Sequence, residues 1–166
     1  MNKKDILLIV GVVLIVIAAF FAMDSTSANP EIEVPLALSK NEVGAIKIDY
    51  DTYESKIENK ENFIIVIERT GCSFCEKYMP VLETVTNKLG IAIYYIDTAD
   101  LTRDEYEKLG ESNSYLKRER WGTPTTLLLS GKTVIDSIGG YVEEATLTDF
   151  VEKNIILTKE NNTDTE

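Results

Sequence analysis

Cys72 and Cys75 are the only cysteines in the 166-residue chain, and two residues separate them. A thiolate is the nucleophile in disulfide exchange, and a second cysteine at this spacing can release a mixed disulfide by intramolecular attack. The chain contains no histidine, which removes the commonest general base and the commonest metal ligand. The pair therefore predicts redox chemistry in which Cys72 attacks and Cys75 resolves, with their own disulfide in place of a cofactor.

Three other interpretations of the cysteine pair stay open. A structural zinc site would need carboxylates or a second chain as further ligands, because the sequence has no other Cys and no His. A purely structural disulfide would close a very short loop and so contribute little stability. A pair of inert buried thiols is poorly matched to a helix N-terminus. We therefore expect a redox site with no bound metal.

The elements around the cysteines are those that would activate a thiol. Residues 63–67 (FIIVI) are continuously apolar and rich in β-branched side chains, as in a strand buried on both faces. Residues 73–89 follow as a helix with one apolar face and with Pro80 inside it. Cys72 would then lie at the helix N-terminus, where unpaired N–H groups and the helix dipole stabilise an anion. This position predicts a lowered pKa for Cys72.

The rest of the chain alternates short apolar runs with helical patterns, which favours a sheet with helices on its faces. The predicted order is β-α-β-α-β-α-β-β-α, a mixed α/β fold. Besides the two elements above, strands are expected over 45–50, 91–96, 125–129 and 133–138, and helices over 51–61, within 101–120 (one or two helices) and over 143–153.

In this order of elements the sequence resembles the thioredoxin superfamily. Cys72, Cys75 and Pro80 match the active-site helix of that family, residues 121–125 (WGTPT) match its cis-proline segment, and Gly139 with Gly140 matches a glycine region near the end of the fold. Residues 64–80 (IIVIERTGCSFCEKYMP), followed by YYIDTADL, resemble the thioredoxin-like bacteriocin transport accessory proteins. The resemblance covers nearly all of the domain and implies a thioredoxin-like fold with disulfide-exchange activity.

The same resemblance assigns a substrate groove. Pro124 would follow a cis peptide bond, which is accessible before proline and not at ordinary residues. That bond would set the Thr123 backbone against the cysteines, where an extended substrate could pair with it. Phe74 and Trp121 are further candidates for substrate contact, although both could equally be packing residues.

The sequence departs from the family near the dithiol. Gly71 replaces the usual aromatic residue before the first cysteine, and the positions of the buried Asp and Lys of thioredoxin hold Val66 and Ile93. The resemblance therefore does not carry the usual proton relay over to this sequence. Glu68 is the nearest upstream carboxylate, and we regard it as a possible relay, with a merely solvated side chain as the alternative.

The N-terminal segment differs in character from the rest. Residues 6–23 form an uncharged apolar run that could cross most of a bilayer, and Lys3 and Lys4 precede it. These features predict residues 1–23 as cytoplasmic N-terminus and transmembrane anchor, 24–41 as linker, 42–157 as the thioredoxin-like domain and 158–166 as a flexible tail. The domain would lie outside the cytoplasm. A cleaved signal peptide and a secreted domain are the alternative.

Charge and context limit the partners. The net charge of −11 argues against nucleic acid, since phosphate binding needs clustered Lys and Arg. The expected partners are exported protein or peptide substrates and a membrane-bound or extracytoplasmic redox partner. The leading function is a membrane-anchored thiol–disulfide oxidoreductase of open direction, because the reduction potential cannot be read from sequence. The alternative is a non-catalytic accessory module for peptide or bacteriocin export.

Overall fold

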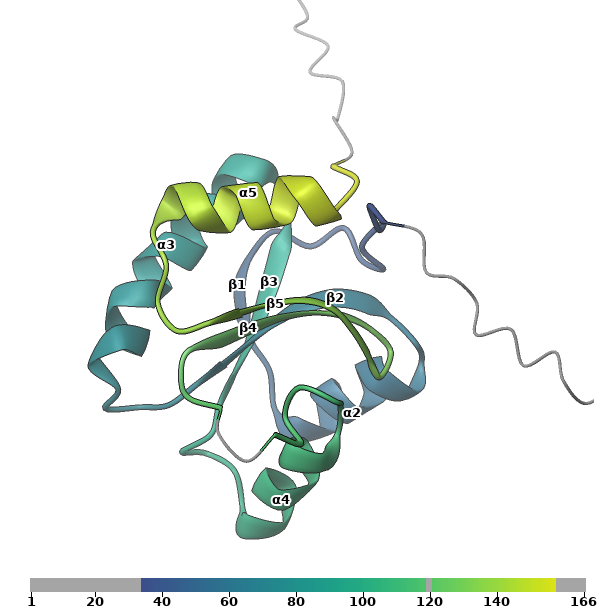
Figure 1. Cartoon of the computed structure of the whole chain (residues 1–166), viewed down its shortest axis with the longest axis vertical. Helices are drawn as coiled ribbons and strands as arrows, with labels where there is room; N and C mark the ends of the chain where they lie inside the picture. The colour runs from purple at the N-terminus through teal and green to yellow at the C-terminus, as the bar shows by residue number, and fades with distance from the viewer. Residues whose placement is uncertain (1–33, 119–120, 158–166) are drawn as a thin grey trace, which may run out of the picture. The chain divides into compact units, whose positions relative to one another are not determined.

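A five-stranded sheet carries helices on both faces in the computed structural model, which describes residues 34–118 and 121–157. The predicted order of elements is confirmed: β1 (Gly44–Lys47), α2 (Tyr50–Glu58), β2 (Asn62–Glu68), α3 (Ser73–Leu89), β3 (Ala92–Asp97), α4 (Arg103–Glu111), β4 (Thr125–Ser130), β5 (Thr133–Gly139) and α5 (Glu144–Asn154). Figure 1 shows α3 and α5 on one face of the sheet and α2 and α4 on the other.

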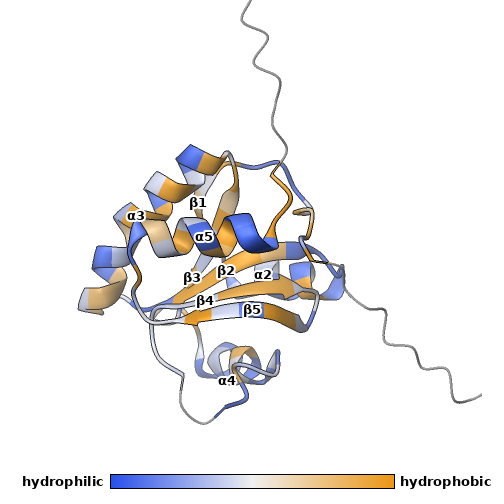
Figure 2. Ribbon diagram, turned by 45° about the horizontal axis from the view of Figure 1, so that its top comes forward, coloured by the Kyte–Doolittle hydropathy of each residue, from blue (hydrophilic) through white to orange (hydrophobic). Residues whose placement is uncertain are grey.

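The strands lie in the order β1-β3-β2-β4-β5, so β2 is at the centre of the sheet. The three strands β1, β3 and β2 are parallel, whereas β4 runs antiparallel to β2 and β5 antiparallel to β4. The residues of β2 from Phe63 to Ile67 are all buried, which the apolar run predicted. The central strands are coloured as hydrophobic over much of their length in Figure 2. Both faces of the central strands are therefore core.

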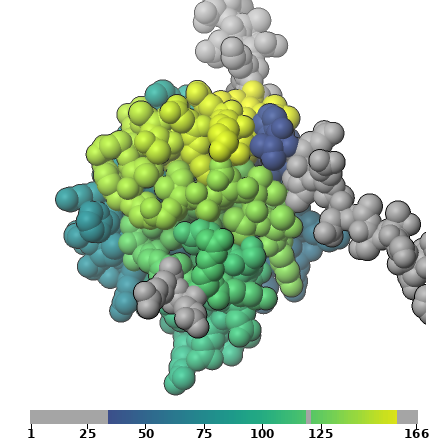
Figure 3. Space-filling model, viewed as in Figure 1, coloured from purple at the N-terminus to yellow at the C-terminus, as the bar shows by residue number. Residues whose placement is uncertain are grey.

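Alternate residues of a strand point to opposite faces, and here they supply two cores. One core joins the sheet to α2 and α4 through buried side chains that include Tyr53, Ile65 and Leu109. On the other face Tyr78 and Leu82 of α3 are buried, and the Tyr78 hydroxyl is hydrogen-bonded to Thr126 Oγ1 of β4 at 3.0 Å. This second core holds the helix that begins at the cysteines. Figure 3 shows the α4 and α5 segments at opposite ends of one face of the molecule, with β5 between them.

Some predicted boundaries are wrong by a few residues, for local reasons. The first strand was expected over 45–50, but it ends at Lys47 because Asp49 caps α2, its carboxylate accepting from the Thr52 N–H at 2.9 Å. The region 101–120 contains one helix, α4, in the part that the structure describes; a capping box of Thr102 and Glu105 begins it. The bounds of α3 are as predicted, since Cys72 caps its start and Gly90, in the left-handed conformation, ends it.

The described residues before β1 contact the domain. Leu36 is buried and forms a parallel bridge with Ile155, its N–H donating to the Asn154 carbonyl at 2.7 Å. The Ser39 N–H donates to the Asn62 carbonyl at 3.1 Å. The last part of the segment expected to be a linker is thus packed against the folded body. No helix within residues 34–118 and 121–157 is long and apolar enough to span a bilayer, and the expected anchor at 6–23 lies outside the described residues.

Candidate active site

A tight turn over residues 69–72 joins the end of β2 to the start of α3 and carries Cys72. The Cys72 N–H donates to the Arg69 carbonyl at 3.1 Å, which closes a four-residue turn. Gly71, the third residue of this turn, has a φ of 81°, a conformation that a type II turn requires and that glycine adopts without strain. A glycine at this position therefore has a conformational reason, which the sequence comparison with the family did not reveal.

The two cysteines differ in exposure and in hydrogen bonding. Both are free thiols; Cys72 is half-buried, while Cys75 is 1% exposed. The Cys75 N–H donates to Cys72 Sγ at 3.3 Å, as expected for a cap residue at a helix N-terminus. A substrate can therefore reach the first sulfur more easily than the second.

The same surroundings give the two thiols different acidities. Partial burial acts to raise the pKa of Cys72, but hydrogen bonds from the Cys75 and Thr123 side chains and from the backbone N–H groups of Cys75 and Phe74 outweigh it, so the pKa is lowered. Burial and the hydrogen bond to Cys72 both raise the pKa of Cys75, which reaches about 11. At neutral pH the Cys72 sulfur is thus the better nucleophile of the pair.

The segment before β4 lies against the Cys72 sulfur. The Cys72 thiol donates to the Thr123 carbonyl at 3.4 Å, and the bond between Thr123 and Pro124 is cis, as the sequence predicted. The Gly140 N–H donates to the Pro124 carbonyl at 2.8 Å, which ties the segment to the end of β5. Thr123, Pro124 and the dithiol, far apart in the sequence, therefore meet at one place.

An open cleft of about 400 Å³ lies beside this segment. Trp121 is half-buried at the edge of the core, and its ring packs against that of Tyr106, with 6.0 Å between the centroids. Phe74 is 58% exposed and lies near Lys77, whose Nζ is 5.9 Å from the ring centroid. Trp121 is thus a wall of the cleft, which is lined by Arg69, Thr98, Tyr106, Trp121, Gly122 and Thr123.

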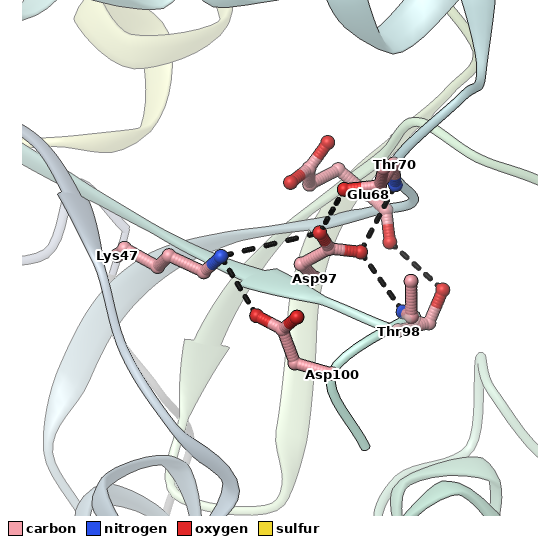
Figure 4. Close-up of polar contacts among 7 residues, drawn as sticks. Lys47, Glu68, Thr70, Asp97, Thr98 and Asp100 are labelled. Atoms are coloured by element: carbon pink, nitrogen blue, oxygen red, sulfur yellow. Dashed lines mark hydrogen bonds and ion pairs between the residues drawn. The ribbon is translucent and has the colours of Figure 1, made fainter.

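Glu68 ends β2 and is half-buried beside Asp97 (Figure 4). Burial and then repulsion by Asp97 raise the pKa of the Glu68 carboxyl. No hydrogen bond joins this carboxylate to either cysteine within the residues that the structure describes, so its role as proton relay stays a prediction. Val66 and Ile93 are fully buried, and neither side chain can take part in proton transfer.

A carboxylate next to the site was not among the residues predicted from the sequence. Asp97, at the end of β3, is 2% exposed and accepts hydrogen bonds from Thr70 in the turn that carries Cys72 (Figure 4). The available signal was a carboxylate directly after an apolar strand. Arg69 and Tyr106, which line the cleft, were missed as well, because nothing in their local sequence distinguishes them from solvated surface residues.

Comparison with known proteins supports the fold. No protein-family model matches the chain. Among solved structures it is similar to thioredoxin from Aeropyrum pernix, with 16% identity, a TM-score of 0.51 and coverage of 72% of this chain and 94% of that one. It is also similar to thioredoxin NaTrxh from Nicotiana alata, with 15% identity, a TM-score of 0.51 and coverage of 70% of this chain and 97% of that one. A mutant thioredoxin from Halobacterium salinarum has 20% identity and a TM-score of 0.50, with coverage of 76% of this chain and 98% of that one. The fold is therefore thioredoxin-like.

Proposed function

We propose that this chain is a thiol–disulfide oxidoreductase that acts on exported proteins or peptides. The observation that supports the proposal most directly is the asymmetry of the two sulfurs. Cys72 is accessible and has a lowered pKa, whereas Cys75 is buried one turn inside the helix with a pKa of about 11. Nucleophile and resolving thiol need these different properties.

The exchange uses only the two cysteines. The Cys72 thiolate attacks one sulfur of a substrate disulfide, so a mixed disulfide forms and the other substrate sulfur leaves as a thiolate. Cys75 then loses its proton and attacks Cys72 Sγ, which forms the disulfide between the two cysteines and frees the second substrate thiolate. Two electrons pass from the dithiol to the substrate, and a dithiol redox partner restores the protein. The reverse sequence oxidises a substrate dithiol.

The cleft supports an extended peptide as substrate. Thr123 lines it and also contacts Cys72 Sγ through its carbonyl. The rings of Trp121 and Tyr106 supply apolar surface to the cleft. Phe74 does not line this cleft, but its exposed ring lies between the two cysteines in the sequence. The resemblance of residues 64–80 to bacteriocin transport accessory proteins favours exported peptides within this class.

Catalytic turnover tests the proposal against the accessory-module alternative. The purified full-length protein should accelerate the reduction of insulin by dithiothreitol, and Cys72→Ser should abolish the acceleration because no nucleophile is left. Cys75→Ser should lose multiple turnovers as well. If the wild-type protein matches the uncatalysed rate with insulin and with a scrambled disulfide substrate, the non-catalytic export module becomes the better assignment.

We further propose that residues 6–23 anchor the protein in the membrane with the domain outside. The apolar run after Lys3 and Lys4 supports this topology. Protease added to intact cells should remove the domain from the membrane fraction. A domain that is protected until the membrane is lysed would contradict the topology, and a domain found in the medium at reduced mass would indicate cleavage.

A further inference from the structure

The turn that carries Cys72 is hydrogen-bonded on its inner side to one buried carboxylate, that of Asp97. The Thr70 N–H donates to Asp97 Oδ1 at 3.0 Å, and the Thr70 hydroxyl donates to Oδ2 at 2.5 Å. Next to this contact, the Thr98 N–H and hydroxyl both donate to the Glu68 carbonyl at 2.9 Å. The end of β2 and the turn are thereby bound to the end of β3 (Figure 4).

Asp97 is itself held in place. The Ala99 N–H donates to Oδ1 at 2.9 Å, and Lys47 Nζ lies 3.9 Å from Oδ2 while pairing with Asp100 at 2.7 Å. Burial acts to raise the pKa of Asp97, but the hydrogen bonds from Thr70 and Ala99 and the charge of Lys47 outweigh it, so the pKa is lowered. The carboxylate is ionised at neutral pH and can accept from both groups of Thr70 at once.

From these contacts we propose that Asp97 is a positioning residue for the nucleophile: through Thr70 it fixes the turn that sets Cys72 Sγ against the Cys75 N–H and the Thr123 carbonyl. The proposal rests on the proposed function, in which Cys72 attacks. It concerns the geometry of the sulfur and assigns Asp97 no contact with substrate.

The turn needs such an anchor because little else holds it. Its own closing bond runs from the Cys72 N–H to the Arg69 carbonyl, and both Thr70 and Gly71 are exposed. Gly71 has no side chain to pack, and glycine gives the backbone the most freedom. Without the carboxylate, the turn could pivot at Gly71 and lengthen the 3.3 Å contact between the Cys75 N–H and Cys72 Sγ. A weaker donor at that distance stabilises the thiolate less.

Three variants of the full-length reduced protein test the idea through the rate of Cys72 alkylation by iodoacetamide as a function of pH. Asp97→Ala should raise the Cys72 pKa and slow alkylation at pH 7 by roughly fivefold, the size expected when one hydrogen bond to a charged sulfur is weakened. Asp97→Asn should restore most of the rate, since an amide oxygen accepts from the Thr70 N–H and the hydroxyl can turn to accept from the amide. Asp100→Asn, which removes a carboxylate that bonds Lys47 but not the turn, should match the wild type.

Other outcomes would overturn the proposal. Loss of stability in Asp97→Ala with an unchanged Cys72 pKa would mean a purely structural role. Equal lowering of the Cys72 pKa in Asp97→Ala and Asp97→Asn would mean that only the charge of Asp97 acts on the sulfur, through space. If Asp97→Ala does not fold, Thr70→Val should still slow alkylation about twofold, while Thr70→Ser should not. Equal alkylation rates in Thr70→Val and Thr70→Ser would also reject the proposal. Alkylation needs no turnover, so this test can reject the role of Asp97 while the proposed function holds. Equally, the turnover assay can reject the proposed function while Asp97 still positions the sulfur.

Discussion

At the scale of single residues, the proposed chemistry depends on a difference between two identical side chains. Cys72 caps α3 and accepts from the Cys75 N–H, whereas Cys75 lies inside the helix, almost inaccessible to solvent. The end of a helix leaves N–H groups without intrahelical partners, and these groups stabilise an anion placed among them. Position along one helical turn is thus sufficient to give the two sulfurs different exposure and different acidity.

The difference in acidity predicts the order of labelling. With the pKa of Cys72 lowered and that of Cys75 raised to about 11, iodoacetamide should modify Cys72 first at every pH from 6 to ~9, since a thiol below its pKa is protonated and unreactive. Peptide mapping of the singly alkylated protein measures this directly. Equal labelling of both cysteines across that pH range would remove the basis for the assigned roles.

The assigned roles predict different intermediates when one sulfur at a time is removed. Cys75→Ala leaves a nucleophile that cannot be released, so mixed disulfides with substrate should accumulate on non-reducing gels. Cys72→Ser leaves only a buried thiol and should give no adducts. The reverse pattern, with adducts only in Cys72→Ser, would mean that Cys75 is the attacking cysteine.

At the scale of elements, the candidate active site is a junction of three chain segments. The turn after β2 carries Cys72, the loop before β4 brings Thr123 to the sulfur, and the end of β3 holds the turn from inside through Asp97. The parallel pairing of β2 with β3 sets Glu68 opposite Asp97, and the antiparallel pairing of β2 with β4 sets Ile67 opposite Thr125. The register of the central sheet therefore determines the distances at the site.

The conformation of the turn before Cys72 predicts the effect of adding one methyl group at Gly71. Gly71→Ala meets no atom within 4 Å, so its cost comes from the positive φ alone and should be about 1–2 kcal/mol in the free energy of unfolding. Gly110→Ala is the matched control, because that methyl also meets nothing within 4 Å but lies within α4, where alanine should stabilise by roughly 0.5–1 kcal/mol. Urea denaturation of both variants measures the two values. A neutral Gly71→Ala would contradict the turn geometry described above.

At the scale of the whole molecule, the net charge affects which molecules approach readily. The chain carries 28 acidic against 17 basic residues, a net charge of −11. A field of one sign raises the rate of encounter with oppositely charged molecules and lowers it with molecules of like charge. The effect acts at long range and is independent of the local chemistry at Cys72.

This charge predicts a salt dependence that differs between substrates. A disulfide peptide flanked by Lys should be reduced faster at 10 mM than at 150 mM ionic strength, by about tenfold, because the screening length falls from ~30 Å to ~8 Å. The same peptide flanked by Glu should show the opposite trend. The second-order rate constant of mixed-disulfide formation by Cys75→Ala measures both. Identical salt dependence for the two peptides would show that net charge does not steer the encounter.

Local features of the sequence were sufficient for the elements and for the cysteines. The apolar run at 63–67 and the cap position of Cys72 define β2 and the start of α3 through interactions within a few residues. The cis bond before Pro124 was expected from the resemblance to a family, and the structure has it. These predictions succeeded because each depends on neighbouring residues or on a recognised motif.

The sequence alone thus determined the order of elements, the spacing of the two cysteines and their place at a helix N-terminus, because propensity, capping and motif spacing act within short stretches of chain. Only the tertiary structure decided which distant groups surround the sulfur. Asp97 lies 27 residues from Thr70 and Thr123 lies 51 residues from Cys72, and they meet because strand pairing and the packing of two cores select one register among many. Contacts of this kind depend on the whole chain at once, so no local pattern records them.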